Sequence, residues 1–220
     1  RFIRALALPR LHLVGHSLGG CVAMEYALSR PKHLKTLTLV APAPAEGQTV
    51  LKRTGAGNAL WAGTNSVERP YRWLGVLGID RKVLRRVLKQ MAPTLVDDMR
   101  FEALVDDAIR MSHNAAAGHL KSLQEWDVRS ELADLDLPVL IVGGRNDALI
   151  PAEALQQTAA NLPNGRLILW PTVGHTPHLE RPERFIRILI KFIEQHSADS
   201  LKQFRKGFCR IWSQFIKNSC

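Results

Sequence analysis

The stretch LHLVGHSLGG at residues 11–20 decides the fold class of this 220-residue chain. An apolar run at residues 11–14 leads into a G-x-S-x-G motif, and a helix-forming segment follows at residues 19–29. Strand, sharp turn and helix in this order lift a serine hydroxyl above the end of a sheet. We therefore predict that Ser17 is a nucleophile. The N-terminus of the helix would place the backbone N–H of Leu18 beside a developing oxyanion.

The glycines of this motif bear on whether the turn can form. Gly15 and Gly19 lack a Cβ, so we expect both to let the turn close without a clash. A G-x-S-x-G pattern alone is a weak signal. The alternative interpretation is a glycine-rich turn in which Ser17 only caps the helix. The rest of the chain must distinguish the two.

Three further apolar runs predict buried strands, at residues 37–40, 139–142 and 167–170. Helical patterns follow the last two, at residues 152–161 and from Pro182 onward. This alternation predicts an α/β fold with a mainly parallel sheet and flanking helices.

A long segment without a clear strand signal separates the second strand from the third. Its second part has helical periodicity, at residues 83–88 and 95–111. We call this segment the insertion. We predict that the first part of the core covers residues 1–42 and the insertion residues 43–135. The second part of the core follows at residues 136–196, and a C-terminal extension at residues 197–220.

An orienting carboxylate is predicted at Asp147, which follows the strand at residues 139–142. A serine nucleophile requires a base, and the base requires such an acid. Open α/β sheets carry their sites at the carboxyl ends of the strands. Asp134 and Asp136 precede the same strand, so they would lie at the wrong edge.

The base is predicted at His175, which follows the strand at residues 167–170. Gly174 frees the backbone immediately before it. His178 is the competing candidate one turn further on, and we favour His175. We expect His16, a further histidine near the motif, to be a surface residue or a satisfied core residue.

The composition is that of a globular protein, with 46% apolar and 23% charged residues. The net charge of +10 suggests acidic partners, but no basic run is interleaved with aromatics, so we expect no nucleic-acid binding.

The cysteines are too few and scattered for a disulfide framework or a zinc site, and they predict reduced thiols in a cytoplasmic protein. They are Cys21, Cys209 and Cys220. No run is long enough to span a membrane, no signal peptide opens the chain, and no metal or cofactor is expected.

The C-terminal extension has an apolar stripe at helical spacing over residues 201–216, with basic residues opposite. This pattern fits a helix on a membrane surface. It fits better a helix packed on its own domain, or an extension foreign to that domain. We favour burial against the protein itself, with Trp212 and Ile211 on the buried face.

Three blocks together resemble the α/β-hydrolase superfamily, and in particular its small esterases, cofactor-free haloperoxidases and carbon–carbon hydrolases. They are LHLVGHSLGG at 11–20, LPVLIVGGRNDALIP at 137–151 and GHTPHLERPERF at 174–185. The resemblance implies a Ser17–Asp147–His175 triad and a helical cap over the site, formed by the insertion. It also implies earlier strands and a His-Gly loop with a second oxyanion donor before residue 11. Neither is present in this sequence, so the chain corresponds to a partial α/β-hydrolase fold with an unpaired strand edge.

The expected function is cleavage of an ester, thioester or related acyl bond of a small molecule. The alternatives are a carbon–carbon bond hydrolase with the same triad, and a catalytically impaired fragment that acts as a binding or membrane-associated module. Serine at position 17 argues against dehalogenases and epoxide hydrolases, which use aspartate at the corresponding turn. The sequence leaves the substrate and the oligomeric state open.

Overall fold

The computed structural model describes most of the predicted core and part of the insertion. The described residues are 2–47, 81–95, 98–110 and 126–197, together with 115, 118 and 121–123. The first part of the insertion, residues 48–80, and the extension from residue 198 lie outside them. The amphipathic helix predicted for residues 201–216, and its burial against the protein, therefore stay predictions.

Four parallel strands form one sheet in the order β1-β2-β3-β4. They are β1 (Leu11–His16), β2 (Leu34–Val40), β3 (Val139–Gly144) and β4 (Gly165–Trp170). The predicted α/β class with a mainly parallel sheet is confirmed. Each strand is longer by two or three residues than the apolar run that predicted it, because flanking residues, most of them glycine or polar, join the ladders.

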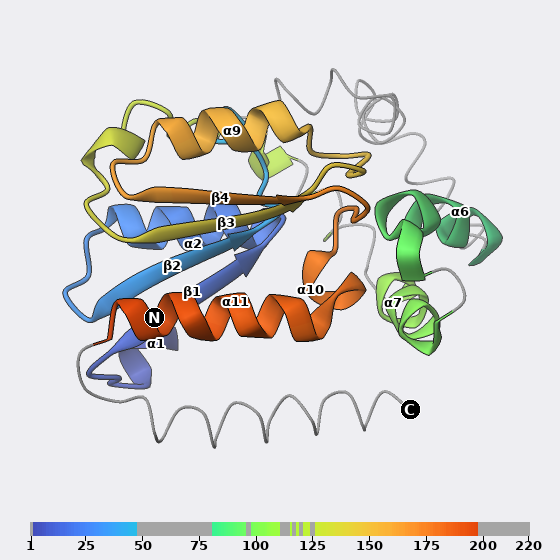
Figure 1. Cartoon of the computed structure of the whole chain (residues 1–220), viewed down its shortest axis with the longest axis horizontal. Helices are drawn as coiled ribbons and strands as arrows, with labels where there is room; N and C mark the ends of the chain where they lie inside the picture. Colours follow the sequence, from blue (N-terminus) through green and yellow to red (C-terminus); the bar gives the residue numbers. More distant parts are fainter. Residues whose placement is uncertain are drawn as a thin grey trace.

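Helices cover both faces of the sheet (Figure 1). On one face lie α2 (Leu18–Leu28) and α9 (Ala152–Ala160), and on the other lies α11 (Pro182–Gln195). The side chains of β2 alternate accordingly, since Leu37 and Leu39 join the first core and Val40 joins the second. Burial on both faces explains why these strands read as continuous apolar runs.

Strand β1 lies at one end of the described sheet, where it pairs with β2 and with no other strand of the described residues. Val14, in the middle of β1, is 44% exposed. Apolar residues of the segment before β1 are also exposed, namely Phe2, Leu6 and Leu8. The short helix α1 (Phe2–Ala5) belongs to this segment.

The insertion contributes α6 (Arg81–Met91), a 3-10 turn η1 (Pro93–Leu95) and α7 (Met99–Ile109). Their apolar faces form a small core of their own, made of Leu88, Ala92, Leu95, Phe101 and Val105. This unit lies beyond the end of the sheet, next to the short helix α10 (Pro177–Glu180) (Figure 1). A second 3-10 turn, η2 (Leu132–Asp134), leads from the insertion into β3. Within the described part of the chain, no helix has the length and hydropathy that a membrane span requires.

Candidate active site

Ser17 occupies a strained turn between β1 and α2. Its backbone has φ 53° and ψ −121°, in the left-handed region that residues with a Cβ rarely adopt. Three backbone hydrogen bonds hold it there: Ser17 N donates to Val40 O (3.0 Å), and Ser17 O accepts from Ala43 N (3.2 Å) and Gly20 N (2.9 Å). The end of β2 and the segment after it therefore fix the turn, and Ser17 is partly exposed.

The glycines of the motif do not all act as the sequence suggested. A Cβ on Gly15 would fall on Gly19 O and 2.8 Å from the Cβ of Ala23, so this position requires glycine. A Cβ on Gly19 would meet nothing within 4 Å, so the prediction that the turn needs glycine at this position was wrong. The second close approach is at Gly20, where a Cβ would lie 2.7 Å from the Cβ of Pro42.

Asp147 follows β3 in a loop that orients its carboxylate. One oxygen, Oδ1, accepts hydrogen bonds from the amides of Leu149 (2.8 Å) and Ile150 (3.0 Å). The side chain is fully buried. The two other candidate acids lie before β3, where Asp134 pairs with Arg30 and Asp136 accepts from Asn164.

His175 lies between this carboxylate and the serine. Its Nδ1 is 2.8 Å from Asp147 Oδ2, and its Nε2 is 2.9 Å from Ser17 Oγ. The structure thus brings together the three side chains that the sequence singled out. In the neutral imidazole, donation from Nδ1 leaves Nε2 free to accept from the Ser17 hydroxyl. Leu18 is the first residue of α2, and amides at this position have no partner inside their helix.

The acid and base loops run in direct contact. Arg145 N donates to Trp170 O (2.9 Å), and Asn146 N donates to Val173 O (3.0 Å). A Cβ on Gly144 would overlap Val173 O, so glycine lets the end of β3 approach the histidine loop this closely. These contacts fix the distance between Asp147 and His175.

Two more histidines surround the base. The ring centroid of His16 lies 5.0 Å from that of His175 and 4.6 Å from that of His178. Burial, followed by the nearby His175, lowers the pKa of His16 to about 3 and that of His178 to about 4. Both rings are therefore neutral near pH 7. His178 does not reach the serine, and its Nδ1 is buried without a hydrogen-bond partner among the described residues.

Sequence reasoning missed several residues that hold the base. His16 Nε2 donates to the carbonyl oxygen of His175 (2.9 Å), so His16 is a satisfied, largely buried histidine as expected, and the sequence did not show that its partner is the backbone of His175. The amide of His175 donates to Met91 O at the end of α6 (2.6 Å). Glu180 binds the amides on either side of His175. No periodicity or motif spacing in the sequence points to these contacts.

Within the part of the chain that the structure describes, no group of three or more His, Cys, Asp or Glu side chains has a metal-binding arrangement. Cys21 is buried and free, and burial raises the pKa of its thiol to about 12. Such a thiol stays protonated and is a poor nucleophile. Ser17 is therefore the candidate nucleophile that the geometry favours over Cys21.

Comparison with known proteins places this chain in a family. A model of the alpha/beta hydrolase family matches residues 1–188, and the chain belongs to that family. It is 33% identical over 183 residues to the pimeloyl-[acyl-carrier protein] methyl ester esterase of Nitrosomonas europaea, covering 80% of this chain and 69% of the relative. It is therefore an enzyme of the α/β-hydrolase type.

The chain is also similar to a hydrolase named for another substrate and to a solved esterase structure. The chain is 29% identical over 201 residues to a 2-hydroxy-6-oxononadienedioate/2-hydroxy-6-oxononatrienedioate hydrolase of Pseudomonas putida, covering 86% of this chain and 64% of the relative. Among solved structures, an esterase from Exiguobacterium antarcticum superposes with a TM-score of 0.72 at 19% identity, over 88% of this chain and 70% of that one. The structural likeness supports the fold.

Proposed function

We propose that this chain is a serine hydrolase that cleaves an ester, thioester or related acyl bond of a small molecule. The observation that carries the proposal is the continuous hydrogen-bonded path from Ser17 Oγ through His175 to Asp147. Each residue stands at the carboxyl end of a strand, where α/β folds place their chemistry.

The geometry supports a two-stage reaction. His175 Nε2 takes the proton of Ser17 as Oγ attacks the carbonyl carbon, and the same nitrogen returns that proton to the leaving group. A water molecule then gives a proton to Nε2 as its oxygen attacks the acyl carbon. Nε2 returns that proton to Oγ as the acyl–Oγ bond breaks, which releases the acid and restores Ser17 and the neutral His175. Asp147 accepts from Nδ1 throughout, which keeps the reactive tautomer and stabilises the imidazolium.

The anionic oxygen of each tetrahedral intermediate requires a donor. Leu18 begins α2, where the helix dipole favours negative charge, and we assign its amide as this donor. A single donor of this kind contributes about 10²–10³ in rate.

A second candidate reaction uses the same three residues. The similarity to 2-hydroxy-6-oxononadienedioate/2-hydroxy-6-oxononatrienedioate hydrolases favours testing bond cleavage in a conjugated 2-hydroxy-6-oxo acid. The esterase relative is more similar in sequence, so we put the ester first.

Two measurements test the proposal. A fluorophosphonate probe labels only an activated serine, so we expect wild type to be labelled on Ser17 and to hydrolyse p-nitrophenyl butyrate. Ser17→Ala should lose both properties, while Ser29→Ala, which changes an exposed serine bonded to Tyr26 O, should keep them. Absence of labelling in wild type would refute the proposal. Faster turnover of a 2-hydroxy-6-oxo acid than of the ester would favour the second reaction.

A further inference from the structure

Glu180, the last residue of α10, is a buried carboxylate outside the triad. Only 2% of it is exposed. Its Oε1 accepts from the amides of Gly174 (2.9 Å) and Thr176 (3.3 Å) and from the Thr176 hydroxyl (3.3 Å). Its Oε2 accepts from the amide (3.3 Å) and the hydroxyl (2.8 Å) of Thr94 in the insertion. One carboxylate therefore joins two parts of the chain through its two oxygens.

The first of these parts is the loop that carries the base. Gly174 and Thr176 flank His175, and the amide of His175 itself donates to Met91 O. Three consecutive amides thus point to acceptors on Glu180 and on the insertion. A Cβ on Gly174 would lie 2.5 Å from the Cδ of Pro93, which shows how closely the insertion packs on this loop.

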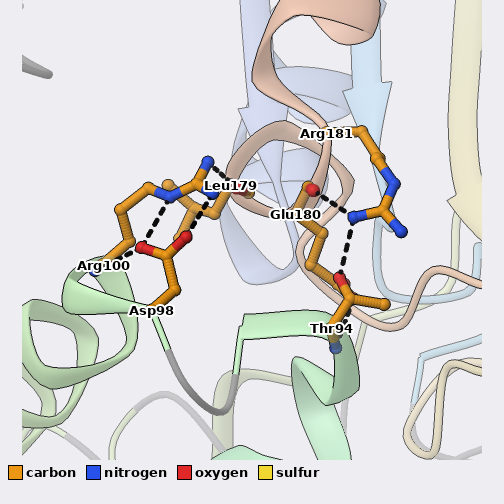
Figure 2. A network of polar contacts seen from close by, with 6 residues as sticks. All are labelled: Thr94, Asp98, Arg100, Leu179, Glu180 and Arg181. Atoms are coloured by element: carbon orange, nitrogen blue, oxygen red, sulfur yellow. Dashed lines mark hydrogen bonds and ion pairs between the residues drawn. The ribbon is translucent and has the colours of Figure 1, made fainter.

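The second part is the insertion, which also contacts the segment after His175 at other points. Arg181 donates to Glu180 O (2.8 Å) and to the Thr94 hydroxyl (3.3 Å) (Figure 2). Arg100, paired with Asp98, donates to Leu179 O (2.8 Å) (Figure 2). The side chain of Leu179 packs against the small apolar core of the insertion. Residues 174–181 therefore contact the insertion at several points.

We propose that Glu180 is a positioning residue for His175, and that through Thr94 it couples the position of the insertion to that of the base. The proposal deepens the proposed function, on which it rests. A buried carboxylate loses stability when its donors are removed, so a shift of Thr94 would also shift the Oε1 bonds to the loop. Because His175 must meet Ser17 Oγ within hydrogen-bond reach, a small displacement of the loop is enough to slow acylation.

The test separates positioning from general stability. Thr94→Val removes the hydroxyl bond to Glu180 and keeps the shape, and Thr94→Ser restores the hydroxyl. Thr158→Val is the control, because it makes the same substitution at a buried threonine whose hydroxyl donates to Ala154 O in α9, away from the site. The fluorophosphonate labelling rate, the kcat and KM for p-nitrophenyl butyrate, the melting temperature and hydrogen exchange of amides 174–176 are measured for each protein.

We expect Thr94→Val to lower the labelling rate and kcat about tenfold or more with KM almost unchanged, since misplacement of about 1 Å costs up to about 10²-fold. Amides 174–176 should exchange faster in this variant alone. Thr94→Ser should match wild type, and Thr158→Val should lower the melting temperature without changing the labelling rate.

Two outcomes would overturn the coupling. One is wild-type labelling and wild-type exchange of amides 174–176 in Thr94→Val. The other is an equal loss of rate in Thr158→Val, which would reduce the effect to stability. If wild type itself is not labelled, the proposed function fails, and the exchange of amides 174–176 alone decides whether Glu180 and Thr94 hold the loop.

Discussion

Replacing Asp147 by asparagine should reverse the direction of the hydrogen bonds at the base. In the native loop Oδ1 accepts from the amides of Leu149 and Ile150, and Oδ2 faces Nδ1 of His175. An asparagine oxygen must keep the two backbone bonds, so its NH₂ group must face His175. That group donates to Nδ1, which leaves the proton on Nε2, and Nε2 can then no longer accept from Ser17.

The size of the effect follows from these bonds. In the opposite orientation the asparagine oxygen would face His175 and its NH₂ group would face the amides of Leu149 and Ile150, which are both donors. Each of these two donors left without a partner costs about 1–3 kcal/mol. The flip therefore costs about 2–6 kcal/mol, and the unreactive tautomer dominates. Loss of the correct tautomer in such a triad lowers kcat about 10⁴-fold. We expect a loss of that order for Asp147→Asn.

The assay is hydrolysis of p-nitrophenyl butyrate at pH 7.5, a value about one unit above the ordinary pKa of histidine, together with the melting temperature. Asp136→Asn is the control, since its carboxylate accepts from Asn164 at the far end of β3. Both variants should stay folded, and only Asp147→Asn should lose activity. Retention of more than about a tenth of the wild-type kcat by Asp147→Asn would refute the tautomer argument, which predicts about 10⁴.

Three further predictions concern stability and reactivity. Gly15→Ala should lower the free energy of unfolding by about 1–3 kcal/mol because its Cβ falls on Gly19 O, whereas Gly19→Ala should raise it by about 0.5–1 kcal/mol; urea unfolding of the two variants distinguishes them. Burial and the nearby His175 lower the pKa of His178 to about 4, so the unfolded chain binds more protons than the folded chain between pH 6.5 and 4. The melting temperature should therefore fall as the pH drops through that window, and it should fall less steeply in His178→Phe. Cys21, whose pKa burial raises to about 12, should react with iodoacetamide at pH 8 only after unfolding, as peptide mapping would show; alkylation of Cys21 in the native protein would contradict its burial.

Much of the core and of the candidate site could be predicted from the sequence because both depend on local patterns. Strands buried on both faces give continuous apolar runs, and Asp147 and His175 each follow such a run. Since parallel strands end at one edge, residues that follow them meet there whatever their separation along the chain. The same argument chose Asp147 over Asp134, which precedes its strand.

The contacts around the base could not be predicted in this way. Thr94 and Glu180 are 86 residues apart, and their hydrogen bonds join a 3-10 turn to the end of a four-residue helix. Periodicity indicates which face of an element is buried, but it gives no information on where a short turn packs. The glycine error has a similar cause. The motif shows that the turn is tight, but only the position of Pro42 shows that the close approach is at Gly20 and not at Gly19.

The backbone around His175 is fixed by two distant parts of the chain and by one residue of its own segment. His16 of β1 binds its carbonyl oxygen, Met91 of α6 accepts from its amide, and Glu180 holds the amides on either side. Two of these ties therefore involve the insertion, directly through Met91 or indirectly through Thr94. If the insertion also shapes the substrate pocket, as the resemblance implies, a substitution there that improves the fit of a new substrate would also move the base. Changes of specificity in this chain should accordingly appear in kcat as well as in KM, because binding and proton transfer share the same support.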